Sequence, residues 1–190
     1  MRSKALFSTI IISVMLTLLS NYFGYSNNTL SEPKIFPYEI KLRDIDGNLI
    51  NFENFRGKYI MIVNVASNCG FTGQYEDLEN LYKKYKEKLV IIACPSNQFG
   101  NQEPGNNSQI KEFCQRNYGV TFIISEKIEV KGENKHQIYK WLTNKDLNGR
   151  LSSEVKWNFQ KYLINTEGNL IDFYYSTTKP NNKNILNHLK

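Results

Sequence analysis

The chain has 190 residues, of which 41% are hydrophobic and 13% aromatic, and its formal net charge is +6. Such a composition can supply a folded core, which argues against intrinsic disorder. Lysine and arginine alternate with acidic residues along the chain and form no basic stripe with interleaved aromatics, so nucleic-acid binding is not expected.

The amino terminus has the pattern of a targeting segment. Arg2 and Lys4 precede an apolar stretch at 5–19, as in a signal peptide or signal anchor. That stretch is shorter than the ~20 residues that a membrane-spanning helix needs. We therefore expect a targeting segment at 1–26 that brings the chain into the secretory pathway or an organelle, with the final compartment open. A linker at 27–35 and one domain at 36–190 follow; a buried core helix is the alternative for the apolar stretch.

The first half of the domain predicts a hairpin, a strand and a helix. Segments 38–43 and 48–52 flank Asp46-Gly47, which is a hairpin signal. Residues 58–66 are rich in aliphatic and β-branched side chains, as in a strand buried on both faces. Apolar residues then recur at three- and four-residue steps, which predicts a helix; they are Tyr75, Leu78, Tyr82 and Tyr85.

The second half continues this alternation. Residues 89–94 predict a second buried strand, and Ser108 is the expected cap of a helix that runs to Tyr118 and ends at Gly119. The remaining expected elements are a helix at 136–142, strands at 162–164 and 170–175 around Glu167-Gly168, and a helix at 181–189. This order predicts an α/β, thioredoxin-like fold with a central mixed sheet flanked by helices.

Cys69 lies in the turn between the strand at 58–66 and the helix that begins near Tyr75. Unpaired N–H groups and the positive end of the helix dipole stabilise a thiolate there, and the thiolate is the form that attacks electrophiles. Free cysteines are more often buried apolar residues. The polar surroundings of Cys69, which include Asn68 and Thr72, favour the reactive interpretation.

Three separated segments resemble the signature blocks of glutathione peroxidases. They are NVASNCGFT at 64–72, NQFGNQEPG at 97–105 and KWNF at 156–159. The resemblance implies that Cys69 attacks the peroxide and that Gln102, Trp157 and Asn158 complete a catalytic tetrad. Amide and indole N–H groups suit this role because they stabilise a thiolate and a leaving oxygen without adding charge.

The other two cysteines have different expected roles. Cys114 resembles the second-helix cysteine of the two-cysteine, thioredoxin-dependent branch of that family, which implies a Cys69–Cys114 disulfide; a buried helix-face cysteine is the alternative. A disulfide needs Cα atoms within ~7 Å. Two helices of such a fold are expected to hold Cys69 and Cys114 farther apart than this, so we expect the helix that carries Cys114 to unwind locally. Cys94 ends a buried strand and is interpreted as structural.

The resemblance implies a thiol peroxidase for hydrogen peroxide and organic hydroperoxides, with membrane-lipid peroxides as possible substrates. No bound cofactor is expected, because an external thiol, thioredoxin or glutathione, restores the enzyme. No metal site is expected either, since the cysteines and histidines lack metal-ligand spacing. Tetrameric members of that family carry a longer segment where this chain has 144–155, so the resemblance implies a monomer. Two alternatives stay open, a one-cysteine peroxidase reduced by glutathione and a peroxide sensor or relay.

Overall fold

The computed structural model describes residues 34–190. The predicted targeting segment at 1–26 and most of the predicted linker lie outside the described residues. Within the described part, no helix is long and apolar enough to cross a membrane.

The described chain alternates strands and helices, as the sequence predicts. In chain order, the elements are the 3-10 helix η1 (Phe52–Phe55), β1 (Tyr59–Val65), α2 (Gln74–Tyr85), β2 (Leu89–Pro95), α3 (Asn107–Tyr118), β3 (Ile123–Ile124), α4 (Gln137–Thr143), α5 (Lys145–Asn148), β4 (Lys161–Ile164), β5 (Leu170–Tyr174) and α6 (Lys183–Leu186).

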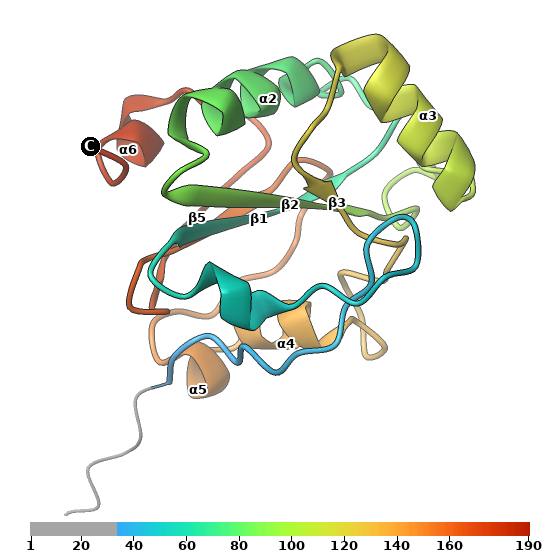
Figure 1. Ribbon diagram of the computed structural model, residues 1–190. Helices are drawn as coiled ribbons and strands as arrows, with labels where there is room; N and C mark the ends of the chain where they lie inside the picture. The colour runs from blue at the N-terminus through green and yellow to red at the C-terminus, as the bar shows by residue number, and fades with distance from the viewer. Residues whose placement is uncertain (1–33) are drawn as a thin grey trace, which may run out of the picture. The chain divides into compact units, whose positions relative to one another are not determined.

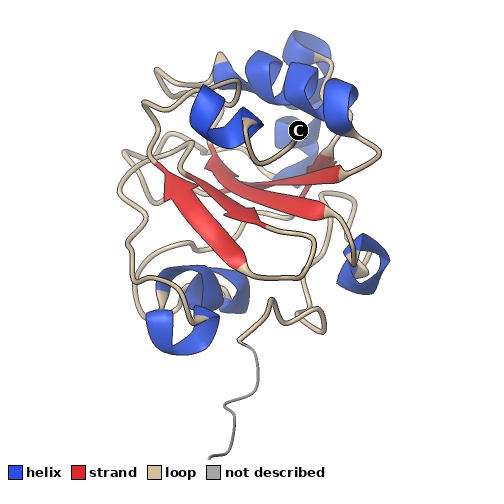
Figure 2. Cartoon of the chain, turned by 90° about the vertical axis from the view of Figure 1, so that its left-hand side faces the viewer, coloured by secondary structure: helices blue, strands red, loops and turns tan. Residues whose placement is uncertain are grey.

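The strands form one five-stranded mixed sheet in the order β3-β2-β1-β4-β5. β1 pairs with β2, and β2 with β3, in parallel; β4 pairs antiparallel with both β1 and β5. Helices α2, α3 and α6 cover one face of the sheet, and α4 and α5 cover the other (Figures 1 and 2). Two strand–helix units followed by a hairpin and a helix confirm the predicted thioredoxin-like, α/β fold.

Each face of the sheet has its own hydrophobic core, because side chains alternate along every strand. In β1, Ile60 and Ile62 pack on the α4 side, whereas Met61 and Val63 pack on the side of α2 and α3. This division separates the cysteines. Cys94 belongs to the core on the α4 side, whereas Cys114 belongs to the opposite core, against which Cys69 also packs.

The predicted hairpin at 38–52 forms only as a turn. A single antiparallel bridge joins Arg43 to Leu49, and neither predicted strand is regular. The Asp44 side chain accepts the N–H groups of Asp46 and Asn48, so a side chain takes the place of further ladder bonds. Gly47 supports this turn with a φ of 88°.

Two helix boundaries differ from the sequence-based expectations, and three short elements are additional. The cap of α3 is Asn106 and not Ser108, because Asn106 and Gln109 bond reciprocally through side chain and backbone. The final helix covers only Lys183–Leu186 of the expected 181–189. The short elements η1, β3 and α5 were not predicted, since two to four residues carry too little periodicity to indicate them.

Candidate active site

Cys69 lies in the turn between β1 and α2, where the sequence places it. Thr72 closes this turn: its hydroxyl accepts the Cys69 N–H at 3.0 Å and donates to the Ala66 carbonyl at 2.9 Å. The Phe71 N–H points at the Cys69 sulfur, 3.4 Å away. The Cys69 side chain is half-buried. The turn therefore presents a partly accessible sulfur with a backbone donor already directed at it.

The second signature block forms a loop that is bound to this turn. The Gln102 carbonyl accepts the Asn68 N–H at 3.0 Å, next to Cys69 in the chain. Gly100 and Asn101, with φ values of 62° and 53°, bend the loop back so that Gln102 can make this contact. Asn158 Nδ2 donates to Gln102 Oε1 at 3.0 Å. This bond uses the oxygen of the Gln102 amide and leaves its N–H groups for an acceptor in the site.

The third block is held against β1 by Asn64. The Asn64 amide donates to the Trp157 carbonyl at 3.0 Å, and the Asn64 carbonyl accepts the Phe159 N–H at 2.5 Å. Phe159 has a φ of 63°, which is uncommon for a bulky residue and marks a sharply bent turn. The Trp157 side chain is 39% exposed, and its ring lies 5.9 Å from that of Phe99. Its indole N–H can therefore donate to a bound species.

The structure thus connects all three blocks. Hydrogen bonds join the Cys69 turn to Gln102, Gln102 to Asn158, and β1 to Trp157. Within residues 34–190 no hydrogen bond joins the Cys69 sulfur to the side chains of the other three. The supporting role of Asn64 was missed in the sequence, although a fully buried asparagine in an apolar strand is a usable signal.

Cys114 is on the inner side of α3 and completely buried. Burial raises the pKa of its thiol to about 11, an effect that the nearby Tyr75 hydroxyl partly opposes. Cys69 and Cys114 are both free thiols. Burial also raises the pKa of Cys94, to about 12, and the sheet separates this residue from the other two cysteines. These features support its interpretation as a structural residue.

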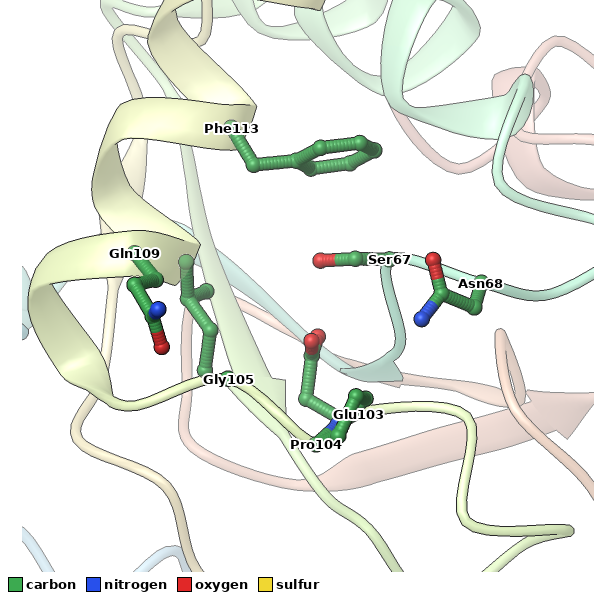
Figure 3. A pocket seen from close by; sticks show the side chains of 8 residues that line it. Ser67, Asn68, Glu103, Pro104, Gly105, Gln109 and Phe113 are labelled. Carbon is green, nitrogen blue, oxygen red and sulfur yellow. The ribbon is translucent and has the colours of Figure 1, made fainter.

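A cavity of about 400 Å³ lies between the turn before Cys69 and α3 (Figure 3). Glu103 belongs to the loop of the second signature block, and its carboxyl points towards Ser67 in this cavity. Neither carboxyl oxygen has a hydrogen-bond partner. Burial raises the pKa of Glu103, whereas Ser67 and Lys127 oppose the shift. In the sequence, only the position of Glu103 directly after Gln102 indicated that it lies near the site. Among the described residues, no group of acidic, histidine and cysteine side chains could hold a metal ion.

Residues 37–143 match the family model described as glutathione peroxidase. The chain is 48% identical over 145 residues to the glutathione peroxidase-like peroxiredoxin gpx1 of Schizosaccharomyces pombe, which covers 75% of this chain and 90% of that protein. It is 39% identical over 163 residues to the hydroperoxy fatty acid reductase gpx1 of Synechocystis, covering 82% of this chain and 91% of that protein.

A solved structure agrees with these relatives. The crystal structure of Trgpx in apo form superposes with a TM-score of 0.62 at 34% sequence identity, and the match covers 80% of this chain and 94% of that one. The family model alone spans more than half of the chain. The chain belongs to the glutathione peroxidase family.

Proposed function

We propose that this protein is a thiol peroxidase that reduces hydroperoxides at Cys69 and is recycled by thioredoxin. The observation that carries the proposal is the hydrogen-bonded connection of the Cys69 turn to Gln102 and of Gln102 to Asn158. It supports the predicted assignment of these residues, together with Trp157, to one site.

In the first step, the Cys69 thiolate attacks the terminal oxygen of the hydroperoxide. An S–O bond forms, the O–O bond breaks, and the leaving alkoxide or hydroxide takes a proton to become alcohol or water, which leaves a sulfenic acid on Cys69. The amide of Gln102 and the indole of Trp157 supply neutral N–H donors for the thiolate and the leaving oxygen. Asn158 orients the Gln102 amide through the bond at 3.0 Å.

In the second step, Cys114 condenses with the sulfenic acid, so that an S–S bond forms and water leaves. Cys114 must first become accessible and ionised, and burial in the closed helix opposes both. Helix α3 fully buries only Ile110 and Cys114, while Phe113 and Tyr118 are partly buried against the same core. Local opening of α3 must release these four side chains. A dithiol such as thioredoxin then reduces the disulfide by exchange, with one mixed disulfide as the intermediate.

The proposed substrates include organic and lipid hydroperoxides as well as hydrogen peroxide. The exposed indole of Trp157 gives the site an open apolar side, on which a bulky acyl chain can lie. The name of the Synechocystis relative points to the same class of substrate.

We also propose that the protein is a monomer, which sedimentation tests. We propose further that residues 1–26 are a targeting segment, which imaging of the chain with and without that segment tests.

The decisive experiment compares three serine variants with thioredoxin or glutathione as the reductant. Cys69→Ser should abolish peroxide-dependent turnover. Cys114→Ser should keep the first oxidation of Cys69 but lose the thioredoxin-driven cycle. Cys94→Ser is the matched control and should cycle normally.

Two outcomes would replace this proposal. A Cys114→Ser protein that turns over well with glutathione would establish a one-cysteine peroxidase. Slow turnover with both reductants, together with mixed disulfides to other proteins in cells, would establish a sensor or relay. Near-normal turnover by Cys69→Ser would refute the catalytic assignment itself.

A further inference from the structure

Lys161 is a completely buried lysine in β4. Its backbone pairs with Val63 of β1 on one side and with Tyr174 of β5 on the other. Its side-chain nitrogen donates to Gln74 Oε1 at 2.5 Å and to the Thr178 carbonyl at 2.6 Å. Lysine is almost never fully buried without a specific partner. The two contacts satisfy the buried nitrogen, and the burial of a lysine at this position needs a functional or structural explanation.

From Lys161, a chain of hydrogen bonds leads to the active site. Gln74, the first residue of α2, uses its Nε2 to donate to the Ser176 carbonyl at 2.6 Å. The Ser176 hydroxyl donates to the Asn158 carbonyl at 2.5 Å. Asn158 in turn donates to Gln102 at 3.0 Å. The path therefore connects the first turn of α2 and the loop after β5 to the hydrogen-bonded side chains of Asn158 and Gln102.

The surroundings of the Lys161 nitrogen disfavour its charged form. Burial lowers the pKa of Lys161 to about 7, and the carboxylate of Asp77 on α2 opposes the shift. A neutral amine, with two N–H donors, and an ammonium, with three, can both make the two hydrogen bonds of Lys161. No ion pair within 4 Å binds it among the described residues. Its contacts are therefore directional hydrogen bonds to neutral oxygens.

We propose that Lys161 is a positioning residue that holds Asn158, and through it Gln102, in the geometry required for peroxide attack. The inference rests on the proposed function and adds a residue to it. Lys161 fixes Gln74 and the loop at Thr178, and these hold Ser176, whose hydroxyl anchors the backbone of Asn158. The anchor is needed because Asn158 precedes Phe159, whose positive φ is held only if neighbouring contacts impose it.

The test is Lys161→Met, which keeps an unbranched side chain one atom shorter than that of lysine and removes the donors. Oxidation of Cys69 by peroxide, followed by rapid quenching and mass spectrometry, should slow roughly tenfold, less than the 10²–10³ lost when a donor to the reacting oxygen is itself removed. Reduction of the enzyme's disulfide by thioredoxin should stay within about twofold, because it does not use the Gln102 amide. Lys86→Met, at the exposed end of α2, is the matched control and should change neither rate.

A double-mutant cycle separates positioning from general loss of structure. If Lys161 acts through the Asn158 side chain, adding Lys161→Met to Asn158→Ala should slow oxidation by less than about twofold further. Full additivity of the two effects would overturn the inference, as would an unchanged oxidation rate in Lys161→Met. If Lys161→Met does not fold, Ser176→Ala removes one bond of the path and must show the same selective loss.

These outcomes are distinct from failure of the proposed function. If Cys69 were not the peroxidatic residue, the unsubstituted protein would form no sulfenic acid at that position. If only the role of Lys161 is wrong, Cys69 oxidation in the unsubstituted protein remains fast, and Lys161→Met matches it.

Discussion

Weakening the cap of α3 should accelerate disulfide formation. The Asn106 side chain accepts the Gln109 N–H at 3.0 Å, and the Gln109 side chain accepts the Asn106 N–H at 2.9 Å. Asn106→Ala removes the first of these bonds. Loss of such a cap costs about 1 kcal/mol of helix stability. Because α3 must open before Cys114 can react, the loss should raise the population of the open helix.

The size of the effect follows from this free energy. A change of about 1 kcal/mol alters an equilibrium constant about fivefold. If opening is a rapid pre-equilibrium, conversion of the Cys69 sulfenic acid to the disulfide should therefore become about fivefold faster. The oxidation of Cys69 itself should not change, since Asn106 makes no contact with the Cys69 turn among the bonds described.

The assay mixes reduced protein with one equivalent of peroxide, quenches with a thiol-alkylating reagent and follows sulfenic acid and disulfide by mass spectrometry. Asn182→Ala is the matched control, because it removes an asparagine cap from α6, where the side chain accepts the Asn184 N–H at 2.9 Å. The reasoning is refuted if hydrogen exchange shows a loosened α3 in Asn106→Ala while disulfide formation keeps the rate of the parent protein.

Three further predictions concern Gln102, Cys94 and Glu103. Gln102→Ala should slow Cys69 oxidation by roughly 10²-fold in a quenched-flow measurement and leave disulfide reduction unaffected; equal slowing of both steps would contradict its assigned role. Cys94→Ser should keep peroxidase activity but lose ~1–3 kcal/mol of stability in chemical denaturation, because it buries a hydroxyl in an apolar core; loss of activity in a folded variant would give Cys94 a redox role. Burial raises the pKa of Glu103 in the folded state above its value in the unfolded state. The carboxylate therefore destabilises the fold increasingly as pH rises from the unfolded-state pKa to the folded-state pKa. Glu103→Gln should therefore gain stability relative to the parent protein on going from pH 4 to pH 8, as measured by denaturation, and a difference independent of pH would refute this.

The sequence by itself determined the order of the main elements and the place of the reactive cysteine. Buried strands at 58–66 and 89–94 could be read because aliphatic residues cluster there, and the helix after Cys69 because apolar residues recur with helical spacing. The three signature blocks, compared with a known family, singled out Gln102, Trp157 and Asn158. All of these signals are local, since each lies within a dozen or so neighbouring residues.

The tertiary structure alone decided what those residues contact. Side-chain alternation along β2 points Cys94 to one face of the sheet, and α3 packs Cys114 against the other face. This became clear only once the register of β2 and the placement of α3 were known. The burial of Glu103 and the path from Lys161 to Asn158 could not be read from the sequence either. They join residues far apart in the chain, such as Lys161 and Gln74, and which polar groups lose contact with water depends on packing between elements, not on local pattern.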